Sequence, residues 1–189
     1  MTARLRIFII IPGSSEGNSM IFSKRQVVEL REQGMIVEEY YLESRTNPWY
    51  VLKDLFGIRS AVRKFKPDIV HAHYGTMTAF LGAFSGARKY AITFHGSDLN
   101  FVRSEFILNE ILAKLLSQLA VLRADIVFCV SEKLRQKMWW KRKIAVVIPF
   151  GVNLQKYCPI DRNEARERLN LPLNSQWVLF NNSAPIKRY

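Results

Sequence analysis

The residues that could do chemistry in this chain gather around its three histidines. His71 and His73 are two residues apart, so they share one face if they lie on a strand. His95 is followed directly by Gly96, which permits a close backbone approach, and then by Asp98, which can cap a following helix. A histidine with a pKa near neutrality can exchange a proton or hydrogen-bond a sugar hydroxyl. The segment predicts a polar site, with a plain N-cap at Asp98 partnered by His95 as the alternative.

The same histidines raise the question of a metal. Three histidines could together ligate zinc, but no nearby Asp or Glu spacing resembles a hydrolytic metal motif. The favoured interpretation makes His71 a hydrogen-bonded structural residue at the end of the sheet. It places His73 on a loop that faces a cleft.

A second candidate is the polar loop 13–19, which lies between a predicted strand and a predicted helix. Backbone N–H groups at the start of a helix can hold an anion, so Gly13 and Ser14 are candidate phosphate contacts. The loop has neither the Gly-x-Gly-x-x-Gly pattern nor a Walker Lys-Ser/Thr pair. An ordinary strand-to-helix connection is the alternative.

The elements that must position these residues alternate between strands and helices, which predicts a parallel, doubly wound, Rossmann-like α/β sheet. The polar clusters at 13–19, 71–75, 95–98 and 150–153 all follow strands, where ligands of such sheets bind. Strands are expected at 6–11, 35–42, 67–73, 90–94, 126–130, 144–148 and 177–180, and helices at 20–33, 49–65, 76–87, about 102–123, 132–141 and 161–169.

Periodicity also predicts which side chains are buried. Cys129 lies in an apolar run and is expected to be a small buried residue, while Ser131 and Asp161 are expected N-caps. The inward positions expected on the first two helices are Ile21, Val27, Val28 and Leu30, and then Leu52, Leu55, Phe56, Ile58, Ala61, Val62 and Phe65.

Composition narrows the class of protein. The chain has 189 residues, is 49% hydrophobic and carries a formal net charge of +12. This excludes a disordered or fibrous chain and favours partners that are anionic. The two cysteines are far apart, which favours a reduced, cytoplasmic setting over a disulfide scaffold. No apolar run reaches the roughly 20 residues of a membrane span, and the start of the chain is interpreted as a strand rather than a signal peptide.

The segment 132–143 combines six basic residues and one acid with the pair Trp139-Trp140. The favoured interpretation is a solvated basic helix face with one tryptophan in the core. Contact of Lys133–Lys143 with an anionic membrane surface is the alternative, since Trp favours membrane interfaces and Lys and Arg are drawn to anionic lipid. Nucleic acid is not expected, because no recognised binding module accompanies the charge.

Four segments taken in order resemble the amino-terminal half of the retaining family-four (group 1) glycosyltransferases, which have the two-domain GT-B fold. They are residues 67–73, 92–98, 124–132 and 148–153, with 157–159 after them, and residues 178–187 are similar to the first strand and loop of the donor-binding domain. The resemblance predicts an amino-terminal domain with its linker at 1–173. It predicts the start of a truncated donor-binding domain at 174–189.

This resemblance implies transfer of a sugar from a nucleotide-sugar to a glycan or lipid-linked acceptor, with retained configuration and no metal or other cofactor. It implies that His95 lies near the transferred sugar and that Asp98 contacts donor sugar or acceptor. Both are therefore the candidate catalytic residues. A location in the cytoplasm, peripheral to the inner membrane face, fits lipid-linked acceptors. The candidate substrate-binding residues are Gly13, Ser14, His73, Gly96, Gly151 and Lys187.

Two departures from the family pattern are visible. The paired glycines of its first loop are missing, and Asn182 stands where many members have arginine. The family's paired glutamates that hold the donor would lie past Tyr189, so this chain is expected to be inactive alone. A stand-alone phosphosugar, nucleotide or nucleic-acid binding module is the competing hypothesis. A strand at 177–180 with no partner to pair with favours the transferase.

Overall fold

The computed structural model describes residues 4–100, 107–154 and 157–178. It divides the chain into two compact units, Met1–Phe150 and Gly151–Tyr189, which are treated separately below. Within the described residues, no helix is both long enough and apolar enough to cross a membrane.

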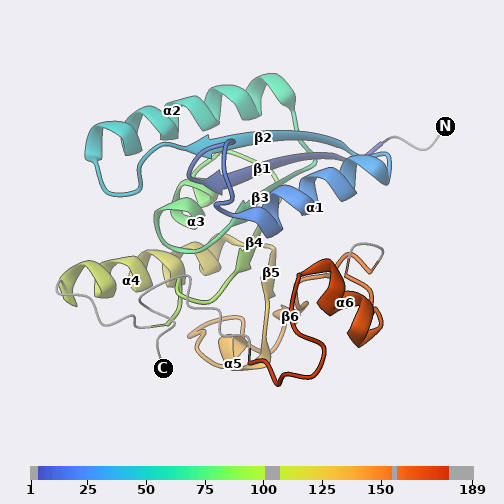
Figure 1. The fold of residues 1–189 in the computed structure, drawn as a ribbon. Coiled ribbons are helices and arrows are strands. Elements are labelled where there is room, and N and C mark those ends of the chain that lie inside the picture. The colour runs from blue at the N-terminus through green and yellow to red at the C-terminus, as the bar shows by residue number, and fades with distance from the viewer. Residues whose placement is uncertain (1–3, 101–106, 155–156, 179–189) are drawn as a thin grey trace. The chain divides into compact units, whose positions relative to one another are not determined.

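The first unit is built on one six-stranded parallel sheet in the order β2-β1-β3-β4-β5-β6 (Figure 1). This confirms the predicted doubly wound, Rossmann-like α/β fold. The strands are β1 (Arg6–Pro12), β2 (Ile36–Leu42), β3 (Ile69–His73), β4 (Tyr90–Phe94), β5 (Ile126–Cys129) and β6 (Val146–Val147), and the helices are α1 (Ile21–Glu32), α2 (Pro48–Phe65), α3 (Thr76–Ala83), α4 (Ile107–Arg123) and α5 (Glu132–Arg135).

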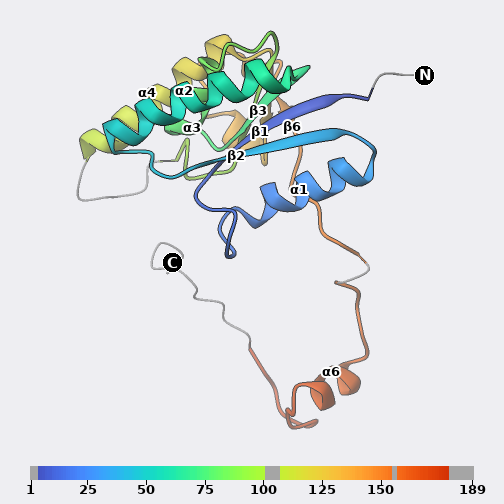
Figure 2. The same cartoon turned by 90° about the horizontal axis from the view of Figure 1, so that it is seen from above.

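Helices cover the sheet on two faces, with α1 on one and α2, α3 and α4 on the other (Figures 1 and 2). Strand β1 is apolar on both faces because it is buried on both. Ile9 packs with Val27 of α1, whereas Phe8 and Ile10 pack in the larger core with Ile58 of α2. The carboxyl ends of the strands therefore share one edge of the sheet.

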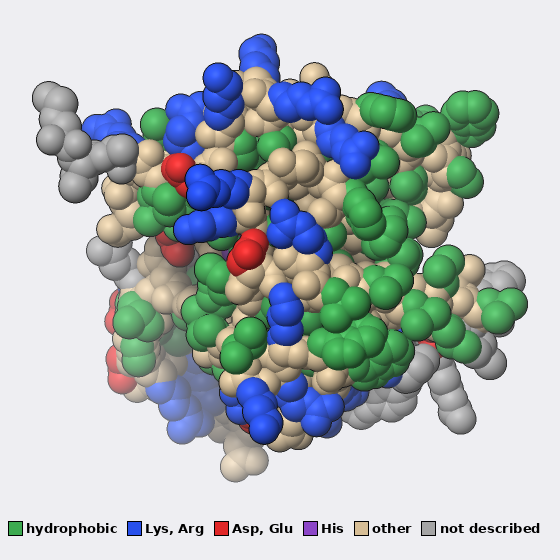
Figure 3. All heavy atoms as spheres, turned by 180° about the vertical axis from the view of Figure 1, so that it is seen from behind, with side chains coloured by type: hydrophobic (Ala, Val, Ile, Leu, Met, Phe, Trp, Pro, Cys, Tyr) green, Lys and Arg blue, Asp and Glu red, His purple; other side chains and the backbone are tan. Residues whose placement is uncertain are grey.

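Three predicted inward positions were wrong. Val27 is buried, but Val28 is 53% exposed, since successive helical residues differ by about 100° and only one of the two can face the sheet. On α2, Ile58 is buried, whereas Leu52 and Phe56 are exposed because they lie two positions off the buried line. Figure 3, the view from behind, shows hydrophobic side chains at the surface on the side of the sheet that α2, α3 and α4 cover.

The helix expected at 132–141 is much shorter. Ser131 caps it as predicted, accepting a hydrogen bond from Leu134 N at 3.3 Å, but α5 ends at Arg135. The chain then turns to bury Met138, whose Sδ lies 3.5 Å from the buried Cys129 Sγ. Leu134 and Met138, rather than a tryptophan, are therefore the core residues of this segment. Trp139 and Trp140 are 48% and 39% exposed.

The second unit contains one described helix, α6 (Arg162–Arg168), capped as predicted by Asp161. Asp161 Oδ1 accepts hydrogen bonds from Asn163 N at 2.8 Å and Glu164 N at 3.2 Å. The strand predicted at 177–180 is not seen at Trp177 and Val178. Its last two residues lie outside the described residues.

Ile58→Ala should lower the free energy of unfolding by about 2–5 kcal/mol, because it opens a cavity between α2 and the sheet. Leu52→Ala, on the exposed side of the same helix, should change it by less than about 0.5 kcal/mol. Urea unfolding followed by circular dichroism measures both. Equal losses in the two variants would contradict the orientation of α2.

Candidate active site

The three histidines meet at the carboxyl ends of β3 and β4. His71 pairs in register with Ile9, so it points to the face of the sheet that α1 covers. The rings of His71 and His73 lie 4.4 Å apart, which follows from their shared strand face. His71 is satisfied by a hydrogen bond of 2.7 Å between its Nε2 and Thr93 Oγ1. His71 is therefore a structural residue in this site.

His73 differs from its predicted place on a loop, since it is the last residue of β3 and is fully buried. Its Nδ1 lies 3.2 Å from Nε2 of His95, so one of these nitrogens donates to the other. The buried Nε2 of His73 has no partner among the described residues. A buried N–H without a partner is rarer than a buried bare acceptor, which assigns the proton of His73 to Nδ1. A neutral His95 then carries its own proton on Nδ1.

All three imidazoles are held neutral. Burial, and to a smaller extent the nearby His95, lower the pKa of His71 from 6.5 to about 4. Burial beside His71 and His95 lowers the pKa of His73 well below its ordinary value. Burial also lowers the pKa of His95, although Asp98 acts in the opposite direction. Among the described residues, no group hydrogen-bonds Nδ1 of His95.

Asp98 fastens the loops that follow β3 and β4 to each other. Its Oδ2 accepts hydrogen bonds from His95 N and Gly75 N, both at 2.9 Å, and its Oδ1 accepts from Gly96 N at 2.7 Å. The side chain is 2% exposed. Asp98 therefore acts on the backbone of both strand ends rather than as a plain helix cap.

The backbone around Gly75 is strained. Tyr74 and Thr76 have φ values of 82° and 57°, which non-glycine residues rarely adopt. A Cβ on Gly75 would stand 2.5 Å from Ser117 Oγ, so a larger residue at this position would clash with the Ser117 side chain. The Ser117 hydroxyl, on α4, accepts from Thr76 N at 2.6 Å and lies 3.1 Å from the carbonyl oxygen of Asp98.

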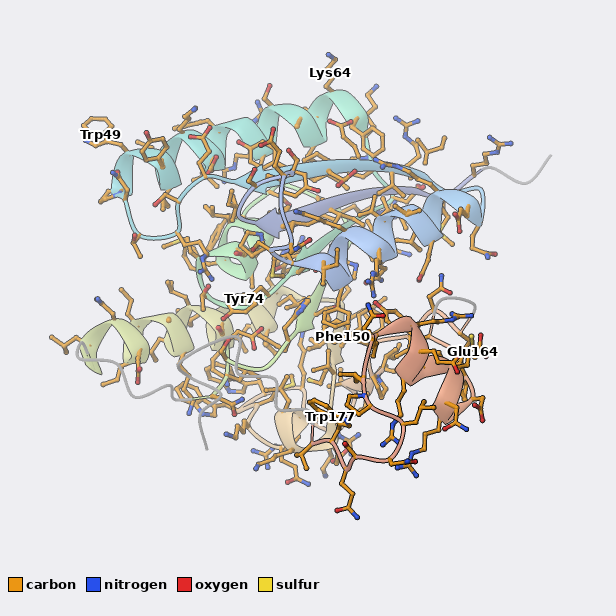
Figure 4. The ribbon with its side chains drawn as sticks, viewed as in Figure 1. Trp49, Lys64, Tyr74, Phe150, Glu164 and Trp177 are labelled. Carbon is orange, nitrogen blue, oxygen red and sulfur yellow. The ribbon has the colours of Figure 1, made fainter. Side chains whose placement is uncertain are left out.

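Two aromatic residues border His95, namely Tyr74 and Phe150. Both of these aromatic residues are labelled in Figure 4. The ring of Phe150 lies 4.9 Å from that of His95 and stacks at 4.3 Å on Phe22 of α1. The Tyr74 hydroxyl lies 2.6 Å from Ser97 Oγ. These contacts exclude water from one side of the imidazole and leave its free edge beside a polar tyrosine.

A hollow of about 400 Å³ lies beside Tyr74, at the ends of β1 and β2. Arg45 lines it and places its guanidinium 5.2 Å from the centre of the Tyr74 ring. Its lining is polar and apolar in about equal parts and consists of Pro12, Gly13, Ser19, Met20, Leu42, Glu43, Ser44, Arg45, Thr46 and Tyr74.

The structure thus places His73, His95, Gly96 and Asp98 together, with Gly13 in the adjoining hollow. The Ser14 hydroxyl accepts from Glu16 N at 3.1 Å in the exposed loop. Of the other predicted contacts, Gly151 belongs to the second unit, which is described by itself, and Lys187 lies outside the described residues.

Sequence reasoning did not single out three residues of the site. Tyr74 and Phe150 stand inside polar clusters that follow strands, so their position was a usable signal. Ser117 stands in the middle of a helix and offered none. The zinc arrangement is not present, because no group of three or more His, Cys, Asp or Glu side chains within the described ranges could hold a metal ion.

The parallel sheet with its covering helices is that of the amino-terminal half of a GT-B protein. The family model described as Glycosyltransferase Family 4 matches residues 18–156, and the chain belongs to that family. This agrees with the resemblance seen in the sequence. No curated protein matches the chain.

Solved structures share the fold at low sequence identity. Sucrose-phosphate synthase from Thermosynechococcus elongatus has a TM-score of 0.65 at 17% identity, covering 89% of this chain and 53% of that chain. A glycosyltransferase from Rickettsia africae has a TM-score of 0.63 at 19% identity, covering 90% and 51%. UDP-GlcNAc 2-epimerase from Neisseria meningitidis, bound to UDP-GlcNAc, has a TM-score of 0.57 at 11% identity, covering 76% and 45%. The chain spans about half the length of these structures.

The buried histidines should make folding stability depend on pH. Between pH 6.5 and about 4 the unfolded chain binds a proton at His71 that the folded chain does not. The free energy of unfolding should therefore fall as pH falls through this window, by about 3 kcal/mol from His71 alone. His73 and His95 act in the same direction. Urea unfolding across this window measures the slope, and His71→Gln should flatten it. A slope unchanged by that substitution would contradict a neutral, buried His71.

Proposed function

We propose that the chain forms the acceptor-side half of a glycosyltransferase that moves a sugar from a nucleotide-sugar to a glycan or lipid-linked acceptor, with retention. In this proposal residues 1–173 are the acceptor-side domain and its linker, and residues 174–189 begin a donor-binding domain. Family membership supports the transfer of a sugar. A solved structure of the same fold, bound to UDP-GlcNAc, supports a nucleotide-sugar as the donor. As the family resemblance implies, no metal or other cofactor is included.

The observation that carries the proposal is a neutral His95 at the carboxyl end of β4, whose Nε2 meets His73 and whose Nδ1 has no hydrogen-bond partner among the described residues. A preorganised donor of this kind can hydrogen-bond a hydroxyl of the transferred sugar and stabilise charge that develops on it. Because the pKa of His95 is lowered, the imidazole acts as a hydrogen-bond donor and not as a strong acid. His73 fixes this tautomer through the bond between the two rings.

Asp98 has a positioning role in the proposed reaction. Both of its carboxylate oxygens already accept backbone N–H groups, and the side chain is almost fully buried. Its contribution is to hold the backbone of His95 and Gly96 where the imidazole meets the sugar. Contact between Asp98 and a substrate would require these bonds to open.

The hollow beside Tyr74 is the proposed acceptor site. Its lining of hydroxyl groups, Arg45 and Glu43 suits a small polyhydroxylated group, and Gly13 offers backbone at its edge. Gly151 and Lys187 are proposed to contact the donor. Ser14 and the rest of its loop are proposed to approach the donor phosphates.

The proposed setting is the cytoplasm, at the inner face of a membrane that carries the lipid-linked acceptor. Two free cysteines support a reducing compartment, with Cys129 buried and Cys158 exposed. The segment Lys133–Lys143 supports contact with anionic lipid, since both of its tryptophans are partly exposed.

The 189-residue chain alone should show negligible transfer with any nucleotide-sugar. Catalysis of this type depends on holding donor and acceptor together, which supplies much of the rate. Mass spectrometry of acceptor glycans incubated with a panel of nucleotide-sugars measures it. Robust turnover by this chain would contradict the two-domain proposal, and epimerisation of the nucleotide-sugar without transfer would contradict the reaction.

In the complete enzyme, His95→Ala should lower kcat by roughly 10²-fold or more, as loss of a preorganised donor does. Folding should survive, because His95 lies at a strand end and only its ring contacts would be lost. The matched control is His71→Gln, which should change the free energy of unfolding more than kcat. Steady-state kinetics and urea unfolding separate the two effects. An unchanged kcat in His95→Ala would leave that residue without a catalytic role.

A further inference from the structure

Helix α4 is apolar on two opposite sides. Its inner side packs into the core through Ala120 and Val121, which are buried, together with the buried Ser117. Its outer side carries a stripe of large apolar residues at helical spacing, with exposed fractions from 39% to 80%. These residues, called the α4 stripe below, are Leu108, Ile111, Leu112, Leu115, Leu119 and Leu122.

Such an outer side is unusual for a helix on the surface of a folded unit. A surface helix normally turns polar residues to water, and one that is apolar all round is normally covered. The α4 stripe is contiguous, because residues three and four apart are neighbours on a helix. Contiguous exposed apolar surface of this kind marks an interaction site. Figure 3 shows hydrophobic side chains on this side of the unit, bordered by many Lys and Arg and few acids.

Helix α4 is joined to the segment Lys133–Lys143 by direct contacts. Gln118 of α4 donates from Nε2 to Lys137 O at 3.2 Å and accepts from Trp139 N at 2.9 Å. The ammonium group of Lys114 lies 5.7 Å from the centre of the Trp139 ring. The half-exposed Trp139 therefore stands beside the helix, and the two elements form one surface.

The charge of this surface favours an anionic partner. Glu132, the one acid of the segment 132–143, is already paired with Arg135 at 2.9 Å. A second copy of the chain would bring two such basic surfaces together, which opposes self-association. The charged residues of α4 and of the segment 132–143 are the acids Glu110 and Glu132 and the bases Lys114, Arg123, Lys133, Arg135, Lys137, Lys141, Arg142 and Lys143.

We propose that α4 lies in the plane of an anionic membrane surface, with the α4 stripe inserted among the lipids. Trp139 and Trp140 stand at the level of the headgroups, where tryptophan is favoured, and the basic residues of Lys133–Lys143 contact lipid phosphates. The inference rests on the membrane part of the proposed function and extends it, because it assigns the apolar anchor to helix α4 rather than to the segment Lys133–Lys143. A free phosphate compound would not need the α4 stripe.

Co-sedimentation of the full chain with lipid vesicles tests the proposal. The chain should bind vesicles of phosphatidylcholine mixed with phosphatidylglycerol, and it should not bind phosphatidylcholine alone. The double variant Leu112→Gln with Leu119→Gln should bind the mixed vesicles with an affinity that is lower by roughly tenfold or more. The reason is that the burial of even part of two leucine side chains is lost. Replacing Lys137, Lys141, Arg142 and Lys143 by Gln should abolish the preference for anionic lipid.

The matched control is Val28→Gln with Ile36→Gln. Both are exposed apolar residues, and Val28 lies on α1, on the opposite face of the sheet. This control should bind as the unchanged chain does. Circular dichroism should show all variants folded, since every replaced side chain is exposed or partly exposed.

Three outcomes would overturn the inference. The first is equal vesicle binding by the leucine variant and the unchanged chain. The second is undiminished binding to neutral vesicles. The third is that the unchanged chain forms dimers, the leucine variant does not, and neither protein binds vesicles. Inorganic phosphate that competes fully at constant ionic strength would point to an anion site instead. Vesicle binding requires no nucleotide-sugar, so its failure would leave the proposed transfer of a sugar untouched.

Discussion

Asp98 is the contact on which the geometry of the site depends. One buried carboxylate accepts hydrogen bonds from the backbone after β3 and after β4, and its own carbonyl oxygen lies 3.1 Å from the Ser117 hydroxyl of α4. The ladder between β3 and β4 sets their register as far as His73 and Thr93, but it does not hold the loops that follow. Without this carboxylate, three N–H groups would lose their partner, at a cost of about 1–3 kcal/mol for each that stays buried. The position of the His95 ring follows from that anchoring.

The parallel sheet could be predicted from the sequence because each strand is an apolar run bounded by turns, and each run alternates with an amphipathic segment. The caps at Ser131 and Asp161 were also predictable, since a hydroxyl or carboxylate before a helix has a local role. The orientation of Val28 and Phe56 was not, because hydrophobicity shows that a residue suits a core and not that the core reaches it. The early end of α5 depends on a distant partner, the buried Cys129.

The proximity of the site residues was predictable from the order of the strands, whereas their contacts and protonation were not. Residues at neighbouring strand ends must meet, so the proximity of His73, His95 and Asp98 could be expected from their places after strands. The pairing of one imidazole with another and the neutrality of all three depend on burial, which spacing does not show. Ser117 and the α4 stripe were missed together, since a helix that is apolar on two opposite sides gives no indication of which side is covered.

The left-handed backbone at Tyr74 and Thr76 stores conformational strain in the loop after β3. Each such residue stores about 1–3 kcal/mol, and the hydrogen bonds from Gly75 to Asp98 and from Thr76 to Ser117 hold that energy in place. Ser117 and the α4 stripe stand on opposite sides of one rigid helix, so a rotation of α4 about its axis moves both at once. The Ser117 hydroxyl that holds the strained loop therefore lies on the same helix as the α4 stripe. The position of Tyr74, whose ring lies beside that of His95, therefore depends on the same helix that carries the exposed α4 stripe.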